Sequence, residues 1–372
     1  MMHLTRQQPN PLLLEAHREL LIHQCFLLNQ EKHIMRPFNI LKASCVKIGI
    51  LLTNTGTPDQ PTHRAVRCFL REFLSDRRIV TLPRFLWLPI LHGLVLRLRP
   101  YCSAKLYREI WTPQGSPMRV IMQNLKEILQ IHLMESITLE KKSYQFEVAI
   151  GMNYGHPSIQ EGLDHLQKQN INEIIILPLF PQYSNTTTAS SFDRVMCALK
   201  KWPVLPHLSL IKHYAHHPNY IRALAVSIKT TWEKEGKGQH LLISFHGIPE
   251  KHIKKGDPYA DECQKTASSL AKALHLSRDQ WTLGYQSRFG YNAWLKPATH
   301  VLLSRLPKEG IRHLDVIAPG FAIDCLETLE EIALRGKKIF THSGGEVLRY
   351  IPALNEHALH IALLKDIIFS KI

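Results

Sequence analysis

One histidine stands where ligands commonly bind in α/β proteins. Residues 240–245 form an apolar run that predicts a buried strand, and His246 follows this run directly. Ligand clefts of parallel sheets open beyond the carboxyl ends of the strands. Imidazole changes its protonation state near neutral pH and also binds transition metals. We therefore predict that His246 moves protons or binds a metal; the alternative is a loop histidine hydrogen-bonded to backbone.

Three carboxylates further along the chain share one side of a predicted helix. The segment 324–335 follows a second apolar run, and its Asp324, Glu327 and Glu331 recur at helical spacing. At about 100° per residue, the three side chains fall within an arc of about 60°. A row of carboxylates facing an imidazole suits the capture of a divalent metal and the movement of protons. The alternative is an ordinary solvated helix face.

The segments that must position these groups alternate between short apolar runs and amphipathic stretches. Runs rich in β-branched residues predict parallel strands covered on both faces. The pattern predicts an α/β fold with two doubly wound, Rossmann-like units. No Gly-x-Gly-x-x-Gly follows a strand and no Walker sequence exists, so nucleotide chemistry has no local support. The strands are expected at 47–53, 146–152, 173–179, 208–213, 240–245, 281–286, 314–318 and 338–341.

The charge balance indicates an anionic partner. The formal net charge is +15, which favours nucleic acid, acidic lipid or a ligand carrying carboxylates. The basic residues are scattered, with no Lys/Arg-rich run interleaved with aromatics and no zinc-finger spacing. We therefore predict no nucleic-acid partner.

The seven cysteines indicate a reducing compartment. They include no Cys-x-x-Cys pair, which favours free thiols in a cytosol over a disulfide framework. No cysteine follows Cys325, so the C-terminal residues cannot hold an iron–sulfur cluster with their own thiolates.

The longest apolar stretch, 85–96, is too short to span a bilayer, which needs about 20 residues. Arginines flank it, as they often flank an interfacial segment. It is either a membrane-touching lip, for which we expect Leu88 and Leu91 to face the lipid, or a buried helix. Residues 1–46 read differently from the rest: 12–28 could form one helix, and no signal-peptide pattern precedes it.

Many short motifs occur in one order along the chain. After the first strand come Asn54-Thr55-Gly56-Thr57-Pro58, Arg99-Pro100, Tyr107, Gly115-Ser116-Pro117, Tyr154-Gly155-His156-Pro157 and Leu177-Pro178-Leu179-Phe180-Pro181-Gln182-Tyr183-Ser184. Then follow Ser244-Phe245-His246-Gly247, Gly256-Asp257-Pro258-Tyr259, Tyr285-Gln286-Ser287-Arg288, Trp294, Pro319-Gly320-Phe321 and Asp324-Cys325-Leu326-Glu327-Thr328-Leu329-Glu330-Glu331. From about Lys47 almost to the C-terminus, this series resembles ferrochelatase of the clusterless bacterial type. That enzyme inserts Fe²⁺ into protoporphyrin IX to form protohaem with release of two protons, as the last step of haem biosynthesis.

The resemblance implies two Rossmann-like domains with the porphyrin in the cleft between them. The first would span 47–185, with an apolar lip at about 79–98, and be joined by a C-terminal helix over 355–372. The second, 186–354, would carry the histidine and the acidic helix, and 1–46 would be an extension outside the resemblance.

The resemblance also implies roles for single residues. His246 and Glu327 match the catalytic pair and the metal ligands, and Asp324 and Glu331 would continue the metal path. The porphyrin-binding positions fall on Arg99, Tyr107, Tyr183, Ser184, Trp294 and Phe321. Two positions depart from the family pattern: Asn153 stands where many relatives have Arg, and Cys325 stands where animal relatives have His.

The resemblance implies Fe²⁺ and protoporphyrin IX as substrates, with no tightly bound cofactor and no iron–sulfur cluster. A cytoplasmic monomer or homodimer is expected, touching the inner membrane peripherally. Two other functions stay open: a non-catalytic tetrapyrrole- or haem-binding protein, and a chelatase for another metal or tetrapyrrole.

Overall fold

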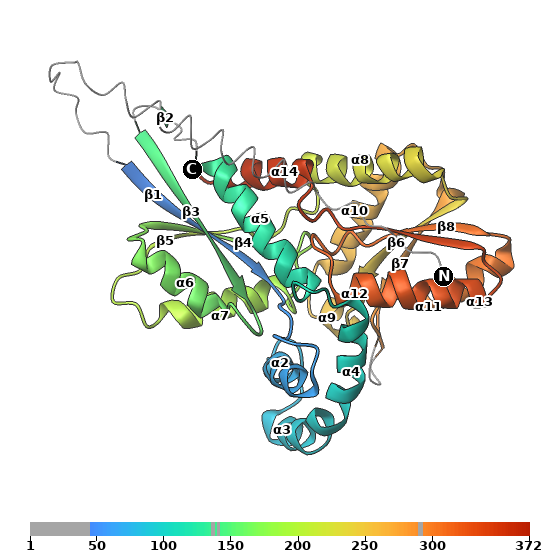
Figure 1. The fold of residues 1–372 in the computed structure, drawn as a ribbon, viewed down its shortest axis with the longest axis horizontal. Helices are drawn as coiled ribbons and strands as arrows, with labels where there is room; N and C mark the ends of the chain where they lie inside the picture. Colours follow the sequence, from blue (N-terminus) through green and yellow to red (C-terminus); the bar gives the residue numbers. More distant parts are fainter. Residues whose placement is uncertain (1–44, 135–137, 140–141, 289–292) are drawn as a thin grey trace. The chain divides into compact units, whose positions relative to one another are not determined.

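A computed structural model describes residues 45–134, 138–139, 142–288 and 293–372. The predicted helix at 12–28 lies outside these residues. The described chain contains two β-sheets (Figure 1). The first has the order β2-β3-β1-β4-β5, and all its neighbours are parallel except β2 and β3. Its strands are β1 (Cys45–Asn54), β2 (Thr138–Leu139), β3 (Lys142–Met152), β4 (Glu173–Pro178) and β5 (His207–Leu210).

The second sheet is parallel throughout, with the order β7-β6-β8-β9. Its strands are β6 (His240–His246), β7 (Trp281–Gln286), β8 (His313–Ile317) and β9 (Val347–Ile351). The strand predicted at 338–341 is wrong, because this segment belongs to helix α13 and the fourth strand follows it. The predicted α/β class with two parallel-sheet units is otherwise as expected.

Helices cover both faces of each sheet, and they occupy most of the remaining chain (Figure 1). Those before β6 are α2 (His63–Ser75), α3 (Arg84–Ile90), the π-helix η1 (Leu91–Val95), α4 (Leu96–Ile110), α5 (Pro117–Leu133), α6 (Ile159–Lys168), α7 (Thr188–Leu199) and α8 (Pro218–Glu235). Those after it are α9 (Glu250–Lys254), α10 (Tyr259–Ala273), the 3₁₀ turn η2 (Arg278–Gln280), α11 (Thr299–Arg305), the 3₁₀ turn η3 (Leu306–Glu309), α12 (Leu326–Thr328), the π-helix η4 (Leu329–Gly336), α13 (Lys337–His342) and α14 (Ala358–Phe369).

The alternation of side chains along β1 explains the layers around the first sheet. Ile50 and Leu52 belong to the apolar cluster that includes α5, whereas Leu51 between them belongs to the cluster with α6 and α7. Successive side chains of a strand point to opposite faces, so a continuous apolar run requires cover on both. The first of these clusters continues through α8 and α10 to Ile243 of β6. The two sheets therefore share one core, and residues 45–372 form one compact unit.

The expected boundary at residues 185/186 does not separate the two sheets. β5 lies beyond it, yet pairs in parallel with β4 of the first sheet. The strand is short and lies at the sheet edge, so its residue pattern carries little sign of which sheet it joins.

Helix α14 packs against both α5 and α8, and the ring of Phe369 meets that of Phe146 edge-on at 5.9 Å.

Candidate active site

His246 is the last residue of β6 and is partly buried. Its Nδ1 lies 2.7 Å from the carbonyl oxygen of Gly247. Because a carbonyl only accepts hydrogen bonds, Nδ1 carries the proton and the neutral ring keeps the lone pair on Nε2. The ring of Phe321 packs edge-on at 6.3 Å and limits how the imidazole can turn. The site therefore holds one oriented imidazole with an available proton acceptor.

The absence of a side chain at Gly247 allows Trp294 to pack close to the residue that follows His246. A Cβ at Gly247 would lie 2.8 Å from the carbonyl oxygen of Gln286 and 3.2 Å from Cε3 of Trp294. Any side chain here would push the indole or the neighbouring strand away. A β-bridge between Pro249 and Trp294 fixes the same segment from the other side. Trp294 is 6% exposed, and its indole packs against Gly247, the residue that follows His246.

Gln286 links the ends of two strands to the acidic helix. It is the sheet partner of His246, and its side-chain Oε1 accepts a 2.8 Å hydrogen bond from Ser244 Oγ. Its Nε2 donates a 2.7 Å hydrogen bond to the carbonyl oxygen of Glu327. Sequence reasoning assigned Gln286 no role, because no spacing in the chain announces a contact with the backbone carbonyl of another residue. This side chain couples the position of Glu327 to that of His246.

Glu327 lies among predicted pocket residues of the first half. Helix α4, which carries Arg99 and Tyr107, contacts both α12 and η4. Burial lowers the pKa of Arg99, and the Glu327 carboxylate opposes that shift. Burial raises the pKa of Tyr107 well above its ordinary value, with a further rise from Glu327. A guanidinium, a neutral phenol and a carboxylate thus lie close enough to influence one another's ionisation.

Cys325 adds a protonated thiol beside that carboxylate. The residue is buried, and burial raises the pKa of its thiol well above the ordinary value, reinforced by Glu327. Because thiolates and not thiols bind metals, Cys325 is a poor metal ligand in this environment.

Asp324 does not belong to a carboxylate row on the helix, so this part of the prediction is wrong. The helix begins only at Leu326, and the Asp324 side chain is buried before it. Its Oδ1 accepts hydrogen bonds from Thr328 Oγ1 at 2.8 Å and Tyr350 Oη at 2.7 Å. Its Oδ2 accepts one from Asn355 Nδ2 at 2.7 Å. These bonds anchor the start of the helix.

The helix itself is π-helical from Leu329, which also departs from the predicted α-helix. The i to i+5 period brings Arg335 to 2.8 Å from the buried carboxylate of Glu330. Glu331 lies on another side, where its oxygens accept hydrogen bonds from the backbone N of Ser287 at 2.8 Å and from the Ser287 hydroxyl. Single-turn π-helical segments are frequent at functional sites.

Tyr183 and Ser184 lie in the loop after β4 and are held by two carboxylates. Asp257 Oδ2 accepts hydrogen bonds from Ser184 Oγ at 3.0 Å and from the backbone N of Asn185 at 2.8 Å. Glu262, which is 6% exposed, accepts one from the backbone N of Tyr183 at 2.7 Å. The Ser184 hydroxyl is therefore engaged inside the protein. Sequence reasoning assigned Asp257 no role and missed this contact.

Asn153, which stands where many relatives have Arg, also lies inside the protein. The Asn153 side chain is buried and accepts a 2.8 Å hydrogen bond from Ser191 Oγ. A guanidinium nevertheless lies nearby, because Arg194 stacks 4.4 Å above the ring of Tyr154.

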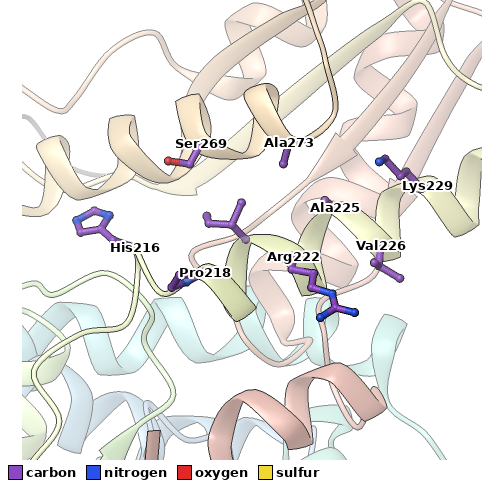
Figure 2. Close-up of a pocket in the computed structure, with 9 residues that line it drawn as sticks. His216, Pro218, Arg222, Ala225, Val226, Lys229, Ser269 and Ala273 are labelled. Atoms are coloured by element: carbon purple, nitrogen blue, oxygen red, sulfur yellow. The ribbon is translucent and has the colours of Figure 1, made fainter. Parts of the chain in front are cut away.

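Within the described ranges, no group of three or more His, Cys, Asp or Glu side chains is arranged to hold a metal ion. A separate surface groove of about 480 Å³ lies between α8 and α10 (Figure 2). It is lined by residues such as His216, Arg222, Val226, Lys229 and Ser269, none of which was predicted for the site.

Comparison with solved structures defines the class of the fold. SirB from Bacillus subtilis with Fe³⁺ superposes with a TM-score of 0.50 at 11% identity, covering 87% of this chain and 95% of that one. At this identity the likeness concerns the fold alone, an α/β fold that the two chains share.

Sequence comparison is more specific. The family model described as Ferrochelatase matches residues 47–372. Ferrochelatase of Aeromonas hydrophila is 49% identical over 322 residues, covering 87% of this chain and 98% of that protein. Ferrochelatase 1 of Shewanella oneidensis is 48% identical over 317 residues, covering 85% and 93%. The chain belongs to the ferrochelatase family. It is a metal chelatase, a lyase of haem biosynthesis that inserts Fe²⁺ into a porphyrin, so the predicted family and enzyme class are confirmed.

Proposed function

We propose that His246 and Glu327 carry out the insertion of Fe²⁺ into protoporphyrin IX. The observation that supports this most is the hydrogen bond from His246 Nδ1 to Gly247, which leaves Nε2 as an acceptor. Metallation releases two pyrrole protons, and a general base must lie within hydrogen-bond reach of the proton it takes. His246 accepts the two pyrrole protons one after the other at Nε2, passing the first to solvent before it takes the second, and Glu327 binds the incoming ion.

Six further predicted residues hold the two substrates. Trp294 and Phe321 stack on the macrocycle, while Arg99, Tyr107 and Tyr183 meet its edge and its carboxylates. A porphyrin held bent exposes its nitrogen lone pairs, so a pocket complementary to the bent ring lowers the barrier. Carboxylate oxygens suit the passage of Fe²⁺ because they bind it loosely enough to release it, and we assign that role to Glu327 and Glu331. For Asp324 and Ser184 the internal hydrogen bonds favour a structural role.

An anaerobic assay tests this proposal. Purified protein is mixed with protoporphyrin IX and Fe²⁺, and the porphyrin's absorbance is followed as it converts to haem. We expect multiple turnovers, with loss of at least about 100-fold in His246→Ala while porphyrin still binds. Glu327→Gln should also depress the rate strongly, whereas the exposed control Glu309→Gln should not.

Other outcomes would redirect the proposal. An unchanged rate in Glu327→Gln would remove that carboxylate from the mechanism. Near wild-type turnover in His246→Ala would remove this residue from the mechanism.

We also propose that α3 and the π-helix after it touch a membrane surface. Large apolar side chains are exposed here, among them Phe85 at 77%, Leu86 at 51% and Leu94 at 56%. No helix among the described residues is long and apolar enough to cross a bilayer. Leu91 is fully buried, so the expectation that it faces lipid is wrong; Leu88 is partly buried and packs against the same cluster.

Liposome flotation tests the membrane contact. Phe85→Ser combined with Leu86→Ser should lower binding to anionic vesicles, because each removes exposed apolar area. Val204→Ser removes an apolar side chain that is 78% exposed elsewhere and serves as the control. Equal binding of wild type and double variant would refute the contact.

We further propose that the protein is a cytoplasmic monomer or homodimer. We also propose that it holds no iron–sulfur cluster, because no cysteine follows Cys325. Acid-labile sulfide in the purified protein would show that a cluster is present and would contradict this proposal. Light scattering measures the mass of the particle in solution and so the number of subunits.

A further inference from the structure

A second cavity, of about 290 Å³, borders the loop that carries Tyr183. Three basic side chains contribute to its wall, together with three groups that can form further hydrogen bonds. These lining residues are Lys251, His252, Lys255, Thr81, Tyr183 and Asn185. Polar pockets with converging cations are suited to small anions.

The basic groups have unused hydrogen-bonding capacity. Lys251 Nζ donates one 2.7 Å hydrogen bond, to Thr81 Oγ1, and an ammonium has two further protons to donate. His252 is only 6% exposed, and its ring makes no hydrogen bond to the residues that the structure describes; burial and the neighbouring Lys251 lower its pKa, so the neutral ring offers one N–H donor. Lys255 is exposed at the mouth and likewise has no partner among these residues. A ligand in the cavity can therefore accept hydrogen bonds from His252 and from the two lysines.

One acidic residue, Asp257, also lines the cavity, but its oxygens are already engaged. Oδ2 accepts the hydrogen bonds from Ser184 and Asn185 described above, and Oδ1 accepts one from the backbone N of Tyr259 at 3.1 Å. These bonds reduce the repulsion that Asp257 would exert on an anion. They also fix the position of the Tyr183 loop before any ligand arrives.

We propose that this cavity binds the carboxylate group of an organic acid. The acid is either the propionate side chain of the porphyrin or a free polycarboxylate. Lys255 and the remaining protons of Lys251 contact the carboxylate oxygens, and His252 donates one further hydrogen bond. The first source rests on the proposed function, because Tyr183 is shared with the expected porphyrin pocket. The second source does not depend on it.

Two binding experiments on the full chain separate the sources. Citrate is titrated by calorimetry, and protoporphyrin IX and its dimethyl ester, in which the carboxylates are blocked, are titrated by fluorescence. The variants are Lys255→Gln and His252→Gln. Lys254→Gln is the matched control, because it removes the same charge from an exposed residue of α9 that does not line the cavity.

A propionate in the cavity predicts about tenfold weaker binding of protoporphyrin IX to Lys255→Gln and unchanged binding of the ester. A free acid predicts about tenfold weaker citrate binding with porphyrin binding unchanged. If neither affinity differs between Lys255→Gln, His252→Gln and Lys254→Gln, the proposal is wrong. Metallation by the wild type is measured in parallel, so that failure of the enzymatic function would show separately from failure of carboxylate binding.

Discussion

Replacing Asp324 with Asn tests whether this carboxylate supports the fold or carries the metal. The substitution keeps the shape of the side chain but turns one acceptor oxygen into a donor. The new amide would face Nδ2 of Asn355, which is also a donor, across the present 2.7 Å contact. The bonds from Thr328 and Tyr350 would become neutral and weaker.

The expected cost follows from these three contacts. A hydrogen bond to a charged group is worth about 1.5–3 kcal/mol, and the side chain is only 5% exposed, so water cannot replace the lost bond. Complete loss of one bond and weakening of two predict that the free energy of unfolding falls by about 3 kcal/mol. Equilibrium urea unfolding, followed by circular dichroism, measures it.

A second substitution makes the test specific. Asn355→Asp in the Asp324→Asn background exchanges the amide and the carboxylate and restores one donor–acceptor pair. The double variant should therefore be more stable than the sum of the two single changes predicts. Wild-type stability of Asp324→Asn, combined with loss of metallation, would refute the structural role and return the residue to the metal path.

Two further predictions concern Gln286 and His360. Gln286→Leu should reduce metallation about 10- to 100-fold with porphyrin binding largely kept, since it frees the Glu327 carbonyl from β7; an unchanged rate constant would contradict this. Burial lowers the pKa of His360 to about 4, so the unfolded chain takes up a proton between pH 6.5 and pH 4 that the folded chain does not. Stability should therefore fall by about 1.4 kcal/mol per pH unit as the pH drops through that window, and His360→Leu should flatten the slope measured by urea unfolding at several pH values.

The strands inside each sheet could be predicted because burial on both faces leaves a continuous apolar run. The prediction failed at the edge of the second sheet, where β9 contains Arg349. Its guanidinium lies 2.6 Å from the carboxylate of Asp315 on the neighbouring strand, and this charged residue interrupts the apolar pattern. The pair Ile339 and Phe340 fits a strand or a helix equally well, so periodicity could not decide between them.

The candidate site was predictable only as far as side-chain type and spacing reveal chemistry. His246 and Glu327 were found from a strand end and a helical spacing. Asp324 has the same spacing, but hydrogen bonds from Thr328 and from the distant residues Tyr350 and Asn355 take it out of the row. Gln286 acts through the carbonyl oxygen of another residue, and no spacing in the chain announces such a contact.

Helix α14 is among the last segments to be synthesised, and this affects how the chain folds. The helix is apolar on nearly all sides, with six buried side chains, and it packs on α5 and α8. About 225 residues separate the end of α5 from the start of α14, which at 5–20 residues per second is roughly 10–45 s of translation. During that interval the ribosome-bound chain presents an uncovered apolar surface on α5, which is a natural target for chaperones. Stalling translation before residue 358 should therefore prolong chaperone association and leave the nascent chain open to proteolysis.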